Sequence, residues 1–369
     1  MSATEESIDV IDAAEMADTA HRVLANHPQR RALAEPRAAQ DHWRQLVDLG
    51  WLTLAIPGAF DGLEQPYTTL VPLYSELGRV LSPAPLLNSM LLVEMLKGSA
   101  LAGQFYAGIA SGEIVVALHR PHDAPLAASP AGDGLRLDGE IAHCLAPSQA
   151  THLVIVIEQA GEPAIAIVET GGAGLEIAPV AFWDPSRALA RVTFSGFTVP
   201  ETALIHVGDP ARAAILRAQA HFDLAIAGDA IGGAAQALQD TIDYSITRQQ
   251  FGRAIGSFQA IKHRCADMRT WLESASALVS HAAQVMSEQG CDTPLAGGAR
   301  LWATEVYRRI AMDAIQIHGG IGFTAEQDCH LFLQRALLDE HLAGGPSDTA
   351  EKLYAPFAEM VAQRFGGLL

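Results

Sequence analysis

A glycine-rich junction between two helical runs is the stretch of this sequence best suited to contact a ligand. The first run ends at Gln316-Ile317-His318, and Gly319-Gly320-Ile321-Gly322 follows before Thr324. Glycine adopts a positive φ readily and lets another molecule approach the backbone closely. With Thr324 as the N-cap of the next helix, free N–H groups there would favour an anion such as a phosphate. A tight helix corner without a ligand is the alternative.

A second junction of the same kind lies upstream. Arg248-Gln249-Gln250-Phe251-Gly252-Arg253 ends one helical run, and Phe258-Gln259 begins the next. Together, Arg-x-x-Phe-Gly…Phe-Gln and Gln-x-His-Gly-Gly-x-Gly-Phe-Thr-x-Glu resemble the C-terminal domain of the acyl-CoA dehydrogenase family in order, helical context and spacing. The resemblance extends over most of the chain.

Composition limits the class of protein. The chain has 369 residues, of which 49% are hydrophobic and 18% charged, as in a globular protein of more than one domain. A formal charge of −18 argues against nucleic acid or an anionic membrane as the main partner. The acidic N-terminus has no signal-peptide pattern, and no apolar run is long enough to span a membrane. Four scattered cysteines lack metal-ligand spacing, which predicts reduced thiols in a cytoplasmic protein.

Apolar spacing divides the chain into three parts, at 1–112, 113–206 and 207–369. The first and last parts have helical periodicity, and the middle part has short Val- and Ile-rich runs separated by Gly, Pro and Asp. The predicted fold is α+β and similar to that of acyl-CoA dehydrogenases. It comprises an N-terminal helical domain, a middle antiparallel β domain and a C-terminal four-helix bundle.

The individual elements follow from the same patterns. In the first part, Glu35-Pro36 opens a helix that stops at Gly50, and a short extended piece follows at Trp51–Ile56. The further predicted helices are Tyr67–Val80, Leu86–Leu96 and Ala100–Ala110, then 209–249, 257–289, 293–317, 325–342 and one after Pro346. The predicted strands are Ile114–Leu118, Leu135–Asp138, Leu153–Glu158, Ala164–Val168 and Ala190–Phe194.

The resemblance implies a flavin enzyme. Family members bind FAD at a subunit interface with an acyl-CoA beside the flavin; a glutamate removes the α-proton while the β-hydrogen leaves as hydride. Residues of this chain would hold the adenosine and pyrophosphate of an FAD that lies mainly in a partner subunit. Arginine would supply charge, phenylalanine a stacking surface and glycine close backbone approach. The residues that the resemblance implicates are Arg248, Gln250, Phe251, Gln259, Gln316, Gly319 and Gly320.

The positions that contact the flavin ring in the family differ in this chain. The family usually has Thr-Glu-Pro-x-Ala-Gly-Ser on the first strand of its β domain. Here the sequence is His119-Arg120-Pro121-His122-Asp123-Ala124-Pro125, and only the proline is kept. Where the family has an aromatic residue followed by Ile-Thr, this chain has His143-Cys144-Leu145. Leucine cannot replace the hydroxyl donor, so the resemblance predicts a weakened ring site.

The catalytic base is also missing from the family positions. Counting forward from Glu326 reaches Ala343, and counting from Arg335 reaches Gly344. Some members place the glutamate on the earlier long helix, at the position of Phe222 here. We therefore assign no catalytic residue. The carboxylates that could act as displaced bases are Asp223, Asp339 and Glu340, and His318 is either an acid or a residue that packs the turn.

Within the family, heteromeric enzymes acting on steroid side-chain CoA thioesters pair a base-bearing subunit with one that keeps mainly the contacts across the interface. This chain resembles the second kind. The leading hypothesis is a subunit of an α2β2 acyl-CoA dehydrogenase that binds FAD, an acyl-CoA thioester and a homologous subunit, with an electron-transfer flavoprotein or similar acceptor. The alternatives are a homotetramer with a relocated base, a flavin-dependent oxygenase or desulfinase, and a non-catalytic CoA-thioester- or partner-binding subunit. The sequence does not specify the acyl group, the partner homologue or the acceptor.

Overall fold

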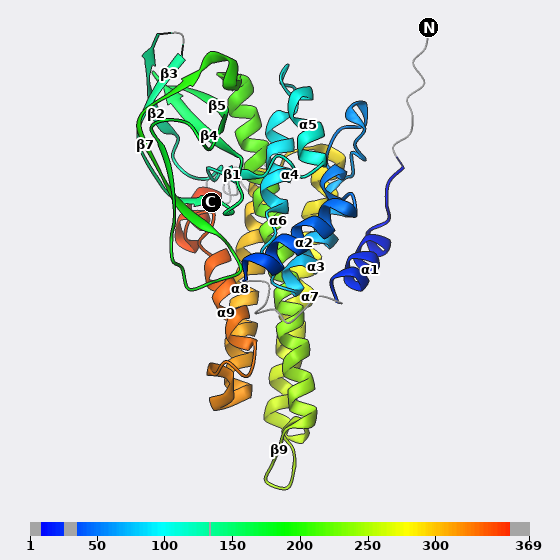
Figure 1. The fold of residues 1–369 in the computed structure, drawn as a ribbon. Helices are drawn as coiled ribbons and strands as arrows, with labels where there is room; N and C mark the ends of the chain where they lie inside the picture. Colours follow the sequence, from blue (N-terminus) through cyan, green and yellow to red (C-terminus); the bar gives the residue numbers. More distant parts are fainter. Residues whose placement is uncertain (1–8, 26–34, 133, 355–369) are drawn as a thin grey trace, which may run out of the picture. The chain divides into compact units, whose positions relative to one another are not determined.

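The computed structural model describes residues 9–25, 35–132 and 134–354, which form two compact units. Among these residues, unit 1 takes in 9–12, 35–70 and 83–222, and unit 2 takes in 13–25, 71–82 and 223–354. Helices α3 (Tyr67–Arg79) and α6 (Asp209–Thr247) contribute residues to both units (Figure 1). The domain boundaries expected near residues 112 and 206 stay a prediction.

Unit 1 begins with short helices. They are α2 (Pro36–Asp48), α4 (Leu86–Leu96) and α5 (Gly103–Ala110), with 3₁₀ turns η2 (Trp51–Thr53) and η3 (Gly58–Phe60). The extended piece predicted at Trp51–Ile56 is wrong. Gly50 lies in the left-handed region (φ 71°) and its carbonyl accepts a 2.7 Å hydrogen bond from Thr53 Oγ1, so the chain tightens into a 3₁₀ turn.

An eight-stranded sheet follows these helices in unit 1. Its order is β6-β7-β3-β1-β4-β5-β8, with β2 paired to β3 and β4. The β1–β4 and β2–β4 pairs are parallel and the other pairs are antiparallel, so the predicted antiparallel character holds for most of the sheet. The strands are β1 (Val116–Leu118), β2 (Leu126–Ala131), β3 (Gly134–Leu145), β4 (His152–Gln159), β5 (Glu162–Glu169), β6 (Leu175–Pro179), β7 (Leu189–Pro200) and β8 (Leu204–Val207), with η4 (Glu201–Ala203) before β8.

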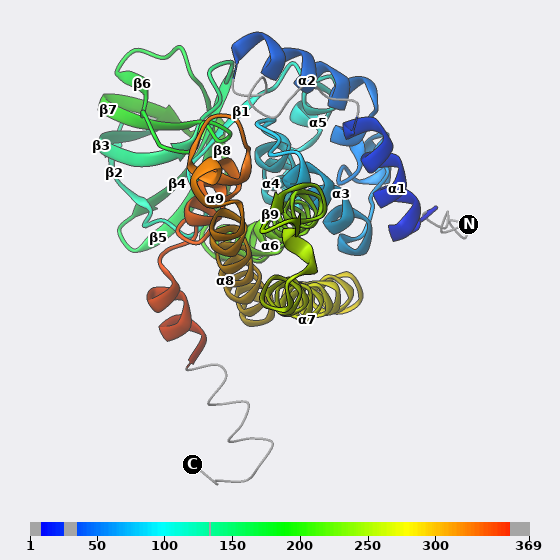
Figure 2. The ribbon, with the colours of Figure 1, turned by 90° about the horizontal axis from the view of Figure 1, so that it is seen from below.

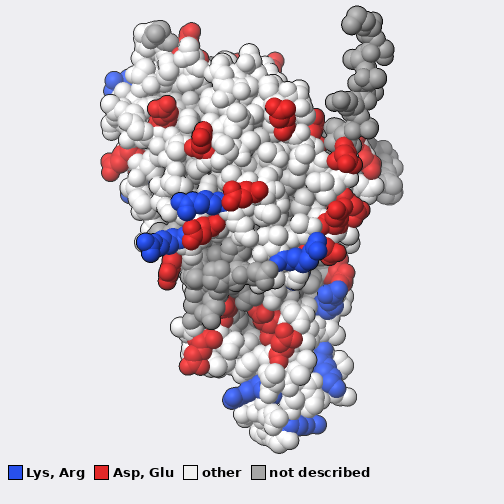
Figure 3. Space-filling model, turned by 45° about the vertical axis from the view of Figure 1, so that its right-hand side comes forward, with Lys and Arg blue, Asp and Glu red and all other residues white. Residues whose placement is uncertain are grey.

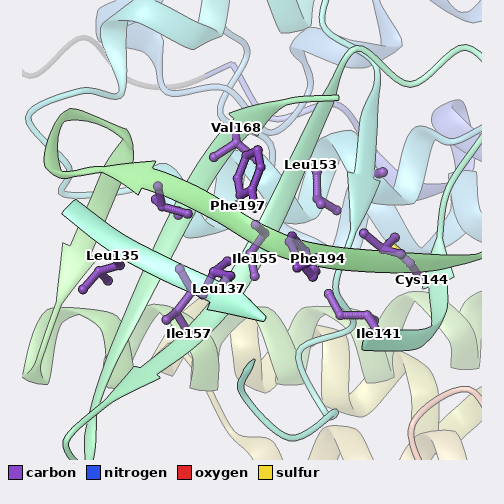
Figure 4. Packing of buried hydrophobic residues seen from close by; sticks show 14 of the residues in the cluster. Leu135, Leu137, Ile141, Cys144, Leu153, Ile155, Ile157, Val168, Phe194 and Phe197 are labelled. Atoms are coloured by element: carbon purple, nitrogen blue, oxygen red, sulfur yellow. The ribbon is translucent and has the colours of Figure 1, made fainter. Parts of the chain in front are cut away.

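Alternate side chains of the long strands fill the interior of this sheet. Leu137 of β3, Ile155 of β4 and Phe194 of β7 lie together at the centre of the buried cluster (Figure 4). Helix α4 is fixed to the same sheet, because Asn88 Nδ2 donates to the carbonyls of Val116 (2.7 Å) and Leu145 (3.0 Å). This buried amide therefore joins the helices of unit 1 to its strands.

Unit 2 is helical. It contains α1 (Ala13–Leu24), the later parts of α3 and α6, α7 (Gln259–Gln289), α8 (Thr293–His318) and α9 (Cys329–Asp339), and residues 346–354 are also helical. Helices α6, α7 and α8 are seen nearly end-on in Figure 2, so their axes run roughly parallel. Within the ranges that the structure describes, no helix is long and apolar enough to cross a membrane.

The helix predicted from residue 325 begins later, at Cys329. Residues Gly319–Phe323 form a 3₁₀ turn, η6, in place of an abrupt break. The hydroxyl of Thr324 donates to the Ile321 carbonyl (2.9 Å) and accepts only a long 3.4 Å bond from the Glu326 N–H. Thr324 therefore closes the 3₁₀ turn, and its predicted role as the N-cap of α9 is wrong.

Helices α3 and α6 approach each other so closely in unit 2 that only glycine fits between them. A Cβ added at Gly232 would lie 1.7 Å from the Ser75 carbonyl oxygen, and one at Gly78 would lie 2.1 Å from the Asp229 carbonyl oxygen. Both neighbours are backbone atoms of packed helices, which cannot move aside without shifting a helix. The sequence of these two helices therefore fixes their separation.

We expect Gly232→Ala to destabilise the protein by roughly 1–3 kcal/mol, because the new methyl group forces α3 and α6 apart. Gly298→Ala is the matched control: this glycine is also helical, has no atom within 4 Å of an added Cβ and should gain about 0.5–1 kcal/mol from helix propensity. Urea unfolding of both variants measures the difference. Equal stabilities would show that the helices can separate freely.

Candidate functional site

The hairpin that follows α6 presents the Arg-x-x-Phe-Gly motif. Strands β9 (Gln249–Gln250) and β10 (Arg253–Ala254) pair antiparallel, and Phe251 and Gly252 connect them with φ of 54° and 79°. Positive φ at both positions suits a tight hairpin loop, yet it is uncommon for phenylalanine and costs free energy. The Phe251 side chain is 91% exposed. The chain therefore holds an aromatic ring outward on a strained loop, which is typical of a binding position.

The glycine turn offers an open backbone at two of its three glycines. Gly319 has φ 64°, and a Cβ added at Gly319 or Gly320 would have no atom within 4 Å. Gly322 is different, because a Cβ there would lie 3.0 Å from the Ile315 carbonyl oxygen. Gly319 and Gly320 are thus available for close approach by a ligand, and Gly322 serves the packing of the turn.

The two motifs lie at the same end of unit 2 (Figure 1). The ring of Tyr244, near the end of α6, stacks on the ring of His318 at the end of α8 with centroids 4.3 Å apart, and Tyr244 Oη donates to the His318 carbonyl (3.4 Å). The His318 Nδ1 lies 2.7 Å from the Ala314 carbonyl oxygen, the geometry of a donated hydrogen bond. His318 is buried. These contacts identify His318 as a residue that packs the turn and joins the two motifs.

All the residues expected to bind the cofactor are exposed at this end: Arg248, Gln250, Phe251, Gln259, Gln316, Gly319 and Gly320. In the described part of the chain, no side-chain hydrogen bond or ion pair occupies Arg248, Gln250, Gln259 or Gln316. Lys and Arg side chains gather at the lowest end in Figure 3, which carries β9 and β10 in Figure 1. An exposed set of unused donors with positive charge and open backbone fits the diphosphate and sugar of an adenine nucleotide.

The segment expected at the flavin ring makes contacts within unit 1 instead. Burial lowers the pKa of His119, and its Nδ1 accepts a 3.3 Å hydrogen bond from the Val156 N–H. Arg120 pairs with Asp123 (2.8 Å). Gln219 Nε2 donates to the Pro121 carbonyl (2.7 Å). His119, Arg120 and the Pro121 carbonyl thus already have partners in the chain.

Strand β3 has no hydroxyl where the family pattern expects one. Cys144 is buried, and burial raises the pKa of its thiol to about 12, so the sulfur is a neutral, weak donor. Leu145 is buried and its carbonyl accepts from Asn88. Neither the His119–Pro125 segment nor the His143–Leu145 segment therefore fits a flavin ring as the family residues would.

The positions at which the family carries its base hold side chains without acid–base function. Phe222 is fully buried, and its ring meets that of His122 edge-on at 5.8 Å. Ala343 is buried, and Gly344 has φ 91°. No side chain at these positions can remove a proton.

The carboxylates nearest to these positions are buried, and two of them pair with arginine. Asp223 accepts a 2.8 Å hydrogen bond from Arg300 Nε, and Arg300 also donates to Thr349 Oγ1 (2.7 Å). Glu340 lies 3.2 Å from Arg308 Nε. Asp339 is fully buried. Asp223 and Glu340 are therefore engaged in ion pairs within unit 2, which argues against either carboxylate facing a substrate.

Glu94 is a buried carboxylate of unit 1 with little sequence signal. Its oxygens lie 2.9 Å from Lys97 Nζ, 3.2 Å from Tyr67 Oη, 3.3 Å from Arg217 Nε and 3.7 Å from His221 Nδ1. Burial acts to raise the pKa of Glu94, but the hydrogen bond from His221 and the charge of Lys97 outweigh it and hold the pKa well below its usual range. Of these contacts, the sequence indicates only the one with Lys97, through the Glu-x-x-Lys spacing at the end of α4. Glu94 is a structural anion.

Comparison with known proteins defines the family. The acyl-CoA dehydrogenase N-terminal domain matches residues 11–112, and the acyl-CoA dehydrogenase C-terminal domain matches residues 213–355. Acyl-CoA dehydrogenase IpdE2 of Mycobacterium tuberculosis is 32% identical over 327 residues, which cover 88% of this chain and 89% of that protein. The chain therefore belongs to the acyl-CoA dehydrogenase family, whose members are FAD-dependent oxidoreductases.

Solved structures share the fold over nearly the whole chain. A variant of the Tcur3481-Tcur3483 steroid ACAD superposes with a TM-score of 0.85 at 24% identity, covering 95% of this chain and 98% of that one. The ChsE4-ChsE5 complex from Mycobacterium tuberculosis gives a TM-score of 0.84 at 22% identity, covering 94% and 97%. The predicted α+β acyl-CoA dehydrogenase fold is confirmed.

We expect Glu94→Gln to lower the free energy of unfolding at pH 7 by roughly 1–3 kcal/mol, because Lys97 and Arg217 lose the carboxylate that neutralises them. A carboxyl whose pKa is lowered by folding stabilises the folded state above its unfolded pKa, and this stabilisation is lost as the pH falls below that value. The wild type should therefore lose stability more steeply than the variant between about pH 5 and pH 3.

Urea unfolding across this pH range measures how steeply the free energy of unfolding changes with pH in the wild type and in Glu94→Gln. The exposed residue Glu201, changed to Gln, is the control and should leave the slope unchanged. Parallel curves for wild type and Glu94→Gln would contradict the low pKa of Glu94.

Proposed function

We propose that this chain is the non-base-bearing subunit of a heteromeric FAD-dependent acyl-CoA dehydrogenase. Its substrate would be an acyl-CoA thioester undergoing α,β-desaturation, with an electron-transfer flavoprotein or similar acceptor downstream. The observation that carries the proposal is the contrast between two regions. The exposed end of unit 2 keeps unused groups suited to a nucleotide, whereas the base positions hold Phe222, Ala343 and Gly344.

This contrast assigns different roles to this chain and to the partner subunit. Arg248 would donate to the diphosphate of an FAD that lies mainly in the partner subunit, and Phe251 would stack on its adenine. Gln250, Gln259 and Gln316 supply neutral donors for the sugar and phosphate, and Gly319 and Gly320 permit backbone contact. FAD, when bound, supplies the acceptor for the substrate hydride. The carboxylate that takes the α-proton would belong to the partner subunit.

Two relatives favour a heteromer. One similar structure is the ChsE4-ChsE5 complex, which contains two different proteins, and another is the Tcur3481-Tcur3483 steroid ACAD, which is named by two components. A surface that exposes Ile246 (64%), Phe251 (91%) and Phe323 (76%) around the candidate nucleotide site also suits a subunit interface. We propose a homologous acyl-CoA dehydrogenase subunit as the partner, in a cytoplasmic α2β2 assembly.

Arg248→Ala should weaken FAD binding to the complex about 10- to 100-fold, because it removes a charge-assisted hydrogen bond worth roughly 1.5–3 kcal/mol. The tetramer should still assemble, since Arg248 is exposed and makes no ion pair in the described residues. Flavin absorbance at limiting FAD, with gel filtration, measures both. Arg269→Ala, which breaks an exposed pair with Glu273 on α7, is the control. Unchanged flavin content in Arg248→Ala would show that Arg248 is only a cation at the end of a helix and does not bind FAD.

Gly320→Val should lower flavin content without a loss of stability. The added side chain has open space within the chain, so it obstructs a ligand and not the fold. Gly171→Val, at another glycine with no atom within 4 Å of an added Cβ, is the control. The same flavin assay and a thermal melt separate the two effects. A lower melting temperature with normal flavin content would assign Gly320 to folding.

No carboxylate of this chain should be needed for α-proton removal. We expect Asp223→Asn, Asp339→Asn and Glu340→Gln, each assembled with the intact partner, to keep acyl-CoA-dependent flavin bleaching within about tenfold, because a true base contributes about 10²–10⁴-fold. Since Asp223 neutralises the buried Arg300, the double variant Asp223→Leu with Arg300→Met replaces both charges and guards against misfolding. A loss near 10³-fold with normal flavin content in any variant would mean that this chain supplies the base.

A further inference from the structure

The hairpin places Arg253 on the same face as Gln250. The two residues are direct partners in the β9–β10 pair, and Ala254 is the partner of Gln249. Residues directly opposite on antiparallel strands point to the same side of the ribbon. A ligand that reaches the Gln250 amide therefore also meets the Arg253 side chain.

The guanidinium of Arg253 is held in position by an aromatic ring. Its central carbon lies 3.9 Å from the centroid of the Phe258 ring, and the Phe251 ring meets Phe258 edge-on at 6.1 Å. A cation–π contact uses the flat face of the guanidinium and leaves its N–H edges free to donate. Arg253 is exposed and pre-oriented as a donor of hydrogen bonds.

Within the residues described, Arg253, like Arg248, has no counter-ion, whereas three other arginines of unit 2 pair with a carboxylate. Arg264 pairs with Asp313 (3.5 Å), Arg269 with Glu273 and Arg309 with Glu305 (2.6 Å). An exposed arginine that is held by an aromatic ring and has no carboxylate partner is locally suited to bind an external anion.

We propose that Arg253 is a further binding residue of the nucleotide site, that it donates to the diphosphate beside Arg248, and that Phe258 positions it. This inference rests on the proposed function, which makes an adenine dinucleotide the ligand of this end of unit 2. Two guanidiniums would then select a ligand with a diphosphate over one that carries adenosine alone. The charge of Arg253, and not its packing, is what the site requires.

The test uses the full chain in complex with its homologous partner, with the flavin removed and the nucleotides added back. Flavin fluorescence gives the affinity for FAD, and competition gives the affinities for ADP and adenosine. Arg253→Ala should weaken FAD and ADP roughly 10- to 100-fold, the effect of losing one charge-assisted hydrogen bond, and leave adenosine unchanged. Arg253→Lys, which keeps the charge, should restore most of the affinity, and Arg269→Ala is the matched control.

The outcomes separate this inference from the function on which it rests. If Arg248→Ala weakens ADP and Arg253→Ala does not, Arg253 lies outside the site while the proposed function stands. If Arg253→Ala weakens adenosine as much as ADP, or if Arg253→Lys fails to restore binding, the residue acts through packing and the inference is overturned. If the wild-type complex binds neither FAD nor ADP, the proposed function itself fails.

Discussion

A buried ion pair between Arg335 and Asp229 sets the arrangement of unit 2. Arg335 is fully buried; its Nη1 lies 3.1 and 3.2 Å from the two carboxylate oxygens of Asp229, and its Nη2 donates to the Ser82 carbonyl (3.0 Å). A buried guanidinium without these partners would be strongly destabilising. The pair therefore requires α9, α6 and the segment that follows α3 to meet at one point. The glycine contacts of α3 and α6 make this possible, since Gly78 lies directly against the backbone of Asp229.

The Arg335–Asp229 ion pair also determines the position of the turn between α8 and α9. With α9 fixed through Arg335 and α8 joined to α6 through the Tyr244–His318 stack, the Gly319–Phe323 turn lies at the same end of unit 2 as the β9–β10 hairpin (Figure 1). The buried contacts stabilise the fold, so the exposed side chains at this end are available to a ligand. The same logic explains the carboxylates. Asp223, Glu340 and Glu94 are each held in an ion pair with an arginine, which gives them a structural role.

Local patterns allow much of the fold to be predicted from the sequence. The helix predicted at Leu86–Leu96 has these bounds in the structure, because a largely apolar run lies between Pro85 and Lys97. Strands β2, β6 and β8 are missed, because they are short and partly exposed, and β2 and β6 contain proline or alanine where apolar alternation is expected. The late start of α9 is missed because the 3₁₀ turn competes with the helix for the Thr324 hydroxyl.

The candidate site is predictable only where its chemistry is local. The Arg-x-x-Phe-Gly and Gly-Gly-x-Gly motifs are contiguous, so they indicate exposed donors and an open backbone before the structure is known. The pairing of Asp223 with Arg300 and the contacts of Glu94 join residues from distant segments, and no spacing rule reports them. The contact between Arg253 and Phe258 is only partly predictable from the sequence, because it depends on the register of the hairpin.

The flavin content of the purified chain tests the central claim most directly. The account predicts that the isolated chain carries little FAD, and that the complex with its homologous partner carries about one FAD for every two chains, because the ring contacts and the base belong to the partner. The ratio of flavin to protein absorbance measures both preparations. A yellow isolated chain with one FAD per subunit would contradict the account.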